Sequence, residues 1–178
     1  AVLIAAGFLV LGPRVFKLIW DVRAPGLIAF ATASSEAAYP RLLEQLERHG
    51  IANRVVSFVL PLGYSFNLDG SMMYCTFAVM FIAQAMGILF DIGQQLGMLL
   101  LLMVTSKGIA GVPRASLVVI SATLPAMGMK PEWIALVLAV DAFMDMGRTA
   151  TNVIGNSIAS AVIAKWEGLL SDPTKDTP

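Results

Sequence analysis

The sequence predicts an all-α membrane protein with two long helices, one of them broken, and two re-entrant helical hairpins. Hydrophobic residues make up 57% of the 178 residues and charged residues only 13%, whereas soluble domains carry about a quarter charged residues. Gly, Pro and polar residues divide the apolar sequence into pieces, several of them shorter than the roughly 20 residues that span a bilayer. The last long apolar segment carries a narrow stripe of ionisable residues. A very apolar soluble α/β domain is the alternative.

The composition also excludes several functional classes. Acidic and basic residues are equal in number and scattered, so the net charge is zero and no nucleic-acid-binding surface is expected. Cys75 is the only cysteine and His49 the only histidine. An internal disulfide, a cysteine-based metal site and a histidine cluster are therefore excluded.

The first fifty residues predict the end of a transmembrane helix followed by a hairpin. Residues 1–12 form an apolar stub without the charged leader of a signal peptide, so we expect the interior of a longer membrane protein. Residues 13–50 contain two helical pieces, neither of which is apolar for long enough to span a bilayer. They predict a re-entrant hairpin whose tip is Ser34-Ser35.

Residues 53–90 predict a broken transmembrane helix. The apolar sequence is interrupted at Asn67-Leu-Asp-Gly-Ser71 and then resumes. A broken helix frees backbone groups that protein, water or ions must satisfy. Because a hard cation prefers oxygen ligands, the Asp69 carboxylate and the freed carbonyls make this break a candidate cation site. A surface turn, which Asn, Asp and Gly also favour, is the alternative.

The remaining sequence predicts a second hairpin and a second long helix. Residues 93–127 form two apolar pieces around a Gly- and Pro-containing tip, and residues 131–166 form a long helix that Pro131 opens. Residues 168–178 are a polar tail that we expect to fray. The order of hairpin, long helix, hairpin and long helix matches secondary transporters, in which discontinuous helices meet at a site near the membrane midplane.

The polar stripe of the last helix is the strongest candidate for a binding site. At about 100° per residue, five polar residues fall on one narrow face and Thr149 lies at its edge; the five are Asp141, Asp145, Arg148, Asn152 and Asn156. Charges inside a membrane helix are costly unless they pair or bind a ligand. Asp145 lies three residues before Arg148, so each can neutralise the other before a ligand arrives. A purely structural ion pair is the alternative.

Four motifs resemble, in order and spacing, those of the dicarboxylate/amino acid:cation symporter family, the glutamate-transporter homologues. They are Ser34-Ser35, Asn67–Ser71, Gly108–Pro113 and Asp141–Asn156. The ending Ala164-Lys-Trp-Glu-Gly168 also resembles bacterial members. The resemblance covers the mobile transport domain of an elevator mechanism and not the N-terminal scaffold that carries the trimer contacts. It implies a multi-pass protein of the bacterial inner membrane that is a homotrimer when full length.

The resemblance also implies two sets of binding residues. Arg148 would bind the side-chain carboxylate of the substrate and Asp145 its amino group. The implied substrate contacts are Ser34, Ser35, Ala110, Gly111, Val112, Asp145, Arg148, Thr149 and Asn152. The implied cation ligands are Gly63, Asn67, Asp69, Ser71, Gly108, Asn152 and Asn156. Na⁺, protons or both are the implied coupling ions, with no further cofactor.

Several positions depart from the family pattern. Asn156 stands where strictly sodium-coupled members carry Asp, so the sodium stoichiometry is open and proton coupling gains weight. Glu36 replaces a third serine at the first hairpin tip, and Ile109 and Arg114 alter the small-residue form of the second. Glu36 or Asp141 is a candidate proton carrier if it is desolvated. Arg114 is alternatively explained by snorkelling toward a membrane interface.

Two transport functions follow from these residues. The first is symport of acidic amino acids, glutamate or aspartate, and the second is symport of C4-dicarboxylates such as succinate, malate and fumarate. Asp145 favours the first because it provides an acceptor for an amino group. A channel or a non-transporting scaffold is a different class, and a channel would need a continuous lined pore. An enzyme is not expected, because no histidine, nucleophile motif or metal cluster accompanies the carboxylates.

Overall fold

The computed structural model describes residues 2–66, 69–106 and 114–171. Within these ranges the chain is helical and contains no strand, which confirms the all-α class. The helices in chain order are α1 (Val2–Leu11), α2 (Arg14–Asp21), α3 (Arg23–Thr32), α4 (Ser35–Arg48), α5 (Asn53–Phe66), α6 (Asp69–Ala85), α7 (Ile92–Thr105), α8 (Ala115–Ala126), the short 3-10 helix η2 (Pro131–Ile134) and α9 (Ala135–Trp166).

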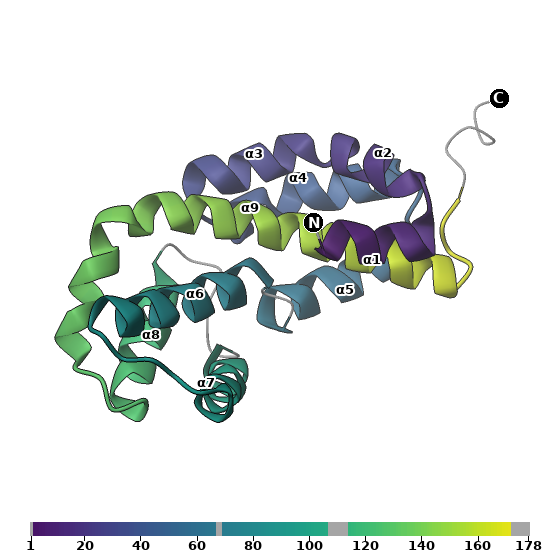
Figure 1. The fold of residues 1–178 in the computed structure, drawn as a ribbon. Helices are drawn as coiled ribbons and strands as arrows, with labels where there is room; N and C mark the ends of the chain where they lie inside the picture. Colours follow the sequence, from purple (N-terminus) through teal and green to yellow (C-terminus); the bar gives the residue numbers. More distant parts are fainter. Residues whose placement is uncertain (1, 67–68, 107–113, 172–178) are drawn as a thin grey trace.

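Helix α9 is 32 residues long and is the element around which the others are arranged (Figure 1). Helices α1 to α6 all pack against it. In Figure 1, α3 and α4 lie on one side of α9 and α5 and α6 on the other, while α7 and α8 lie together at one end of the molecule. A helix that is covered on several sides can carry polar groups only where they find partners. The neighbouring helices must therefore supply hydrogen-bond or ion-pair partners for the polar face of α9.

Two hydrophobic clusters form along α9. The first joins α1 to α5 with the C-terminal half of α9, through residues such as Leu42 and Ala161. The second joins α6, α7 and α8 with the start of α9, through residues such as Ile82 and Val137. Most of the polar stripe, residues 141–152, lies on α9 between the two clusters. The candidate site thus lies between the two hydrophobic clusters.

Helices α3 and α4 are neighbours in space and are joined by a two-residue turn. Ala33 ends α3 in the left-handed conformation, with φ of 49°. Ser34 then has an extended backbone, and its hydroxyl accepts a hydrogen bond of 3.4 Å from the Ala37 N–H, which caps α4. Because serine is a favoured N-cap residue, the Ser34-Ser35 pair sets the place where the chain reverses.

Part of the break predicted in the first long helix is helical instead. Asp69, Gly70 and Ser71 belong to the first turn of α6, although the sequence predicts that they are unwound; Asn67 lies outside the described residues. The reason is a side chain from α9, because Asn152 Oδ1 accepts a hydrogen bond of 2.8 Å from the Gly70 N–H. This bond satisfies one of the amides that a helix start leaves without an intrahelical partner.

Two glycines let the broken helix lie directly against α9. A Cβ atom on Gly63 of α5 would meet the side-chain amide of Asn156, and a Cβ atom on Gly70 of α6 would meet the backbone carbonyl of Arg148. Both approaches are closer than any side-chain carbon tolerates. Gly63 and Gly70 therefore fix how α5 and α6 sit on the polar face.

The end of α9 is tied to the connection between α4 and α5. Leu170 forms an antiparallel bridge with Ile51, and the Ser171 N–H donates to the Gly50 carbonyl at 2.9 Å. The first residues of the tail that we expected to fray are therefore paired with backbone, whereas residues 172–178 lie outside the described ranges.

Large apolar side chains cover much of the outer surface of the described residues. Leu9 of α1 is 87% exposed and Phe143 of α9 is 77% exposed, and similar residues line α2, α6 and α7. By length and composition, the stretch Asn53–Ala85, which contains α5 and α6, is the one in the described part of the chain that is apolar enough to cross a membrane. Helix α9 carries Asp141, Asp145 and Arg148 on a buried face, so its mean hydropathy understates how apolar its outer surface is.

The approach of α6 to α9 predicts that Gly70→Ala destabilises the protein. The new methyl group would meet a helix backbone that cannot move aside, and overpacking of this kind costs about 1–3 kcal/mol. Thermal unfolding of the purified protein in detergent measures the effect. Gly97→Ala in α7 is the matched control, because open space surrounds that position and alanine there should stabilise by about 0.5–1 kcal/mol. An unchanged midpoint for Gly70→Ala would contradict the packing described here.

Candidate functional site

The predicted polar stripe is buried in the fold. Its six residues, Asp141, Asp145, Arg148, Thr149, Asn152 and Asn156, are each at most 5% exposed. Burying a charge costs several kcal/mol unless it is paired and hydrogen-bonded. The contacts of these side chains therefore show which interactions offset the free energy of burying the charges.

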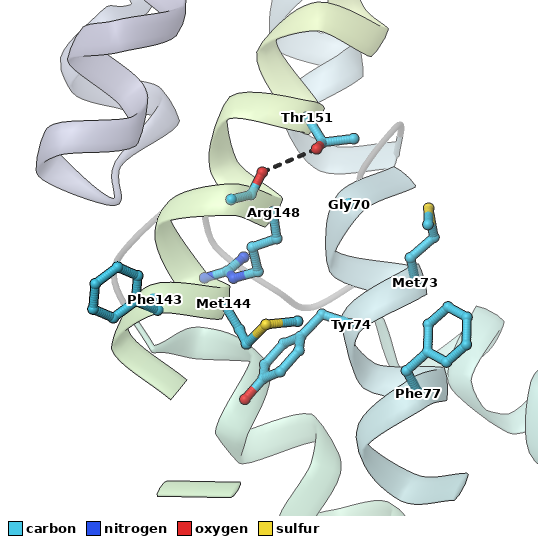
Figure 2. A pocket seen from close by; sticks show the side chains of 9 residues that line it. Gly70, Met73, Tyr74, Phe77, Phe143, Met144, Arg148 and Thr151 are labelled. Carbon is cyan, nitrogen blue, oxygen red and sulfur yellow. Dashed lines mark hydrogen bonds between the residues drawn. The ribbon is translucent and has the colours of Figure 1, made fainter. Parts of the chain in front are cut away.

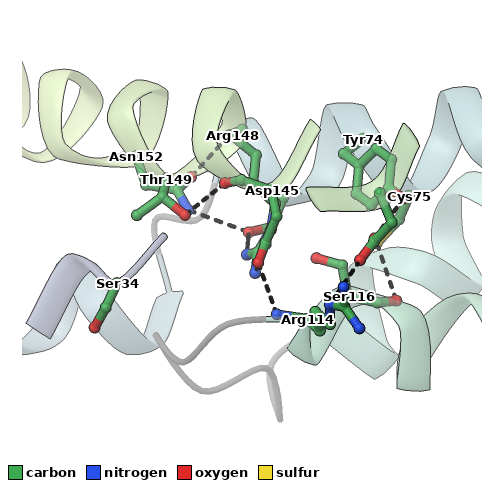
Figure 3. Close-up of polar contacts among 12 residues, drawn as sticks. Ser34, Tyr74, Cys75, Arg114, Ser116, Asp145, Arg148, Thr149 and Asn152 are labelled. Atoms are coloured by element: carbon green, nitrogen blue, oxygen red, sulfur yellow. Dashed lines mark hydrogen bonds and ion pairs between the residues drawn. The ribbon is translucent and has the colours of Figure 1, made fainter. Parts of the chain in front are cut away.

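Asp145 and Arg148 form a buried ion pair within α9. The Nε and Nη2 groups of Arg148 both bind the Oδ1 atom of Asp145. The third guanidinium nitrogen, Nη1, donates to the Ser71 hydroxyl of α6 at 2.8 Å. Figure 3 shows the pair beside the start of α8. The two charges neutralise each other, and Ser71 brings α6 into the same network.

Asn152 links α9 to the first turn of α6 through both ends of its amide. Its Oδ1 atom accepts from the Gly70 N–H, and its Nδ2 group donates to the Ser71 hydroxyl at 3.1 Å. The Ser71 oxygen thus accepts from two donors, Asn152 and Arg148. These bonds fix the position of the α6 start relative to the ion pair.

The second carboxylate oxygen of Asp145 is also used. Its Oδ2 atom accepts a hydrogen bond of 2.7 Å from the backbone N–H of Arg114, the residue just before α8. The Thr149 hydroxyl donates to the Asp145 backbone carbonyl at 2.7 Å. Asp145 therefore joins α8 and α9, and a ligand that binds this carboxylate must share it or displace one of these donors.

Asp141 lies one turn before Asp145 and has partners that the sequence analysis missed. The Tyr74 hydroxyl donates to Asp141 Oδ1 at 2.7 Å, and Nε of Arg114 lies 3.7 Å from Oδ2. Arg114, which snorkelling would also explain, thus has its Nε atom near a buried carboxylate while its side chain is 64% exposed. Tyr74 had a detectable signal, since a tyrosine in an apolar run needs a partner for its hydroxyl.

The candidate cation ligands are only partly free to bind an ion. Asp69 Oδ2 is buried and has no hydrogen-bond partner among the described residues, so it suits a cation. The Ser71 hydroxyl and Asn152 Oδ1 instead accept hydrogen bonds from protein groups. The described residues contain no group of three or more His, Cys, Asp or Glu side chains that could hold a metal. A cation at Asp69 would therefore need carbonyl or hydroxyl oxygens as its other ligands.

The structure does not describe every predicted site residue. Asn67, Gly108, Ala110, Gly111 and Val112 lie outside the described residues. Ser34 and the buried Ser35 stand at the start of α4, which packs on α9. Glu36, the candidate proton carrier of the first hairpin, is exposed.

A groove of about 380 Å³ lies between α6 and α9 (Figure 2). Its walls are mainly apolar and come from residues such as Met73, Phe77 and Phe143, while Arg148 contributes its charged lining. The guanidinium group that pairs with Asp145 therefore also borders an apolar surface.

The arrangement can exchange charged partners. A ligand ammonium group can replace Arg148 on Asp145 Oδ1, and a ligand carboxylate can replace Asp145 on Arg148, without leaving either charge bare. Arginine presents a rigid donor fork that matches a carboxylate.

Comparisons with known proteins identify the family of this chain. Residues 1–166 match the profile of the sodium:dicarboxylate symporter family. The chain is 48% identical over 157 residues to the proton/sodium-glutamate symport protein of Bacillus caldotenax, which covers 88% of this chain and 37% of that protein. It is 50% identical over 156 residues to the proton/glutamate-aspartate symporter of Escherichia coli, covering 88% and 36%.

A relative with a different substrate is equally similar. The C4-dicarboxylate transport protein of Pseudomonas syringae pv. syringae is 48% identical over 160 residues, which covers 89% of this chain and 36% of that protein. The chain thus spans little more than a third of the length of these relatives. The family match nevertheless includes every helix from α1 to α9. The chain belongs to the sodium:dicarboxylate symporter family, a family of membrane-embedded transporters.

Proposed function

We propose that this chain is the transport domain of a secondary symporter that takes up glutamate or aspartate together with Na⁺, protons or both. The observation that carries the proposal is the buried Asp145–Arg148 pair, whose charges mirror those of an acidic amino acid. The ligand's ammonium group would bind Asp145, and its side-chain carboxylate would bind Arg148. The relatives named as glutamate and glutamate-aspartate symporters support this substrate class.

The remaining substrate contacts are proposed from position. Asn152 and Thr149 line the same face of α9 and offer polar groups beside the pair. Ser34 and Ser35, with the backbone of 110–112, would hold the main-chain carboxylate. In this arrangement two re-entrant hairpins, within 13–50 and 93–127, enclose the ligand between them.

The cation site is proposed at the start of α6. Asp69 supplies a buried carboxylate oxygen without a hydrogen-bond partner in the described part of the chain. Carbonyls at Gly63 and Gly108, with Asn67 and Asn156, would complete the oxygen ligands. Asn152 Oδ1 accepts one hydrogen bond and has a second lone pair for a cation. The Ser71 hydroxyl oxygen accepts two hydrogen bonds and could join only after giving one up. Cation binding would then be coupled to a rearrangement around Arg148, the substrate residue.

The whole protein would lie in the bacterial inner membrane as a homotrimer. The exposed apolar side chains of α1, α6 and α9 would face lipid or the scaffold helices of the same protein. Their number is hard to reconcile with contact with water alone.

C4-dicarboxylate symport is the second candidate function. The identity to the Pseudomonas relative is as high as that to the glutamate symporters, so overall similarity does not separate the two. The chemistry of Asp145 does separate them. A dicarboxylate brings no ammonium group, and its negative charges would be repelled by a carboxylate that lies within the ligand's reach.

Arg148→Ala is expected to weaken binding of acidic substrates by more than tenfold. A buried charge pair that loses one partner costs about 2–5 kcal/mol. Small neutral amino acids should then compete better with aspartate. Arg148→Lys is the control, because it keeps the charge but loses the donor fork, and it should retain part of the preference. Binding to the purified intact protein measures this, and undiminished aspartate affinity in Arg148→Ala would exclude the proposed role.

Asp145→Ser is expected to shift preference from aspartate toward succinate or malate. The amino group loses its acceptor, and no negative charge at this position opposes a dicarboxylate. Asp145→Asn retains the size and one acceptor oxygen and should give a smaller shift. The measurement is the ratio of aspartate to succinate affinity in each variant. If Asp145→Ser leaves this ratio unchanged, dicarboxylate symport replaces the amino-acid proposal.

Asp69→Asn is expected to weaken the cation dependence of transport sharply, because it keeps the size of the side chain and removes its charge. Uptake of labelled aspartate as a function of Na⁺ concentration and of pH measures the effect in the intact protein. Glu132→Gln, which neutralises an exposed carboxylate on η2, controls for the change in net charge. Equal cation affinity in the Asp69→Asn and unaltered proteins would rule out this site.

A further inference from the structure

Arg114 stands in an unfavourable backbone conformation at the point where α8 begins. Its φ of 63° lies in the left-handed region, which only glycine adopts without steric cost. A residue with a Cβ atom keeps such a conformation only when surrounding contacts hold it there. The contacts that hold Arg114 in this conformation are therefore candidates for a functional role.

Those contacts reach two carboxylates one turn apart on α9. The backbone N–H of Arg114 binds Asp145 Oδ2 at 2.7 Å, and its side-chain Nε lies 3.7 Å from Asp141 Oδ2. One residue thus holds the start of α8 with its backbone and its side chain at once (Figure 3). Substitution of the side chain removes the guanidinium group and leaves the backbone donor in the chain, so the effect of the second contact on the first can be tested.

The side-chain contact matters because Asp141 is almost fully buried. Its side chain is 1% exposed, whereas that of Arg114 is 64% exposed. Tyr74 satisfies Asp141 Oδ1, but Oδ2 has no hydrogen-bond partner among the described residues. A nearby cation stabilises a buried carboxylate in its charged form. In addition, Asp141 and Asp145 repel each other across one helical turn when both are charged.

We propose that Arg114 is a positioning residue whose guanidinium group, through Asp141, holds the start of α8 on the polar face of α9 and thereby slows ligand release. Arg114 itself need not touch the ligand. Its pairing keeps its own N–H at Asp145, the carboxylate proposed to bind the ligand's amino group. The effect on ligand release rests on the proposed function, whereas the pairing with Asp141 does not.

A double-mutant cycle in the ligand-free intact protein tests the pairing by itself. Arg114→Gln and Asp141→Asn are made singly and together, and amide hydrogen exchange is followed in the peptides that contain residues 114–120. Each single change should speed exchange there by about fivefold, and the double change should add little more, as for a directly coupled pair. The exposed Arg41–Glu44 pair, also 3.7 Å apart, is the matched control, and the corresponding cycle should show no coupling.

Two further variants distinguish the charge from the backbone conformation. Arg114→Gly relieves the positive φ, so a purely conformational role predicts slower or equal exchange. We expect exchange in Arg114→Gly to be as fast as in Arg114→Gln. Arg114→Lys, which keeps the positive charge, should exchange as slowly as the unaltered protein. Strictly additive effects in the Asp141 cycle, or full protection in Arg114→Gly, would overturn the proposal.

The effect of Arg114 on ligand release is tested by measuring the dissociation rate of the ligand. Labelled aspartate should dissociate about fivefold faster from Arg114→Gln than from the unaltered protein, with Arg114→Lys close to the latter. Equal release rates in Arg114→Gln and the unaltered protein would overturn the effect on ligand release. If the unaltered protein binds no aspartate, the proposed function fails, and the exchange cycle still decides whether Arg114 and Asp141 are coupled.

Discussion

The structure depends on one constraint, which is that the charged face of α9 is buried and each charge on it must be matched by a neighbouring element. Helix α9 supplies only the Asp145–Arg148 pair from its own sequence. The other partners come from the first turn of α6, from Tyr74 and from the start of α8. The positions of these elements are therefore set by polar satisfaction, and the apolar clusters on either side hold them there.

The glycines make this matching possible. The hydrogen bond from the Gly70 N–H to Asn152 Oδ1 requires the two helices to approach closely, and the absence of a side chain at Gly70 permits the approach. Gly63 does the same for Asn156 one helix earlier. The close packing of these helices and the polar contacts between them therefore depend on each other. A larger residue at either glycine would displace the groups that stabilise the charges.

The sequence predicted the helical class and the buried stripe because both follow from periodicity. Asp141 to Asn156 recur at helical spacing in an apolar background, and such a face has no stable place except inside the protein. The sequence did not predict where α6 begins, because the cap on Gly70 comes from Asn152, 82 residues away. A local sequence pattern cannot indicate a hydrogen-bond partner that is so distant in the chain.

The same limit explains what was missed at the site. The hydroxyl of Tyr74 in an apolar run indicates that a partner is needed but not which one, and Arg114 reads as one more interfacial cation. That both contact Asp141 is visible only in the structure. Ser71 was expected among the cation ligands, and in the structure its hydroxyl oxygen accepts hydrogen bonds from Arg148 and Asn152. Residue type identifies candidates, and only the arrangement in space decides which partner each one has.

The proposed binding mode requires an acidic amino acid to take over the partners of the Asp145–Arg148 pair. An experimental structure of the intact protein with aspartate bound would show whether it does. We expect the ligand's ammonium nitrogen within hydrogen-bonding distance of Asp145 and its side-chain carboxylate on the Arg148 guanidinium group. An unbroken Asp145–Arg148 pair, with the ligand bound at a different set of residues, would contradict it.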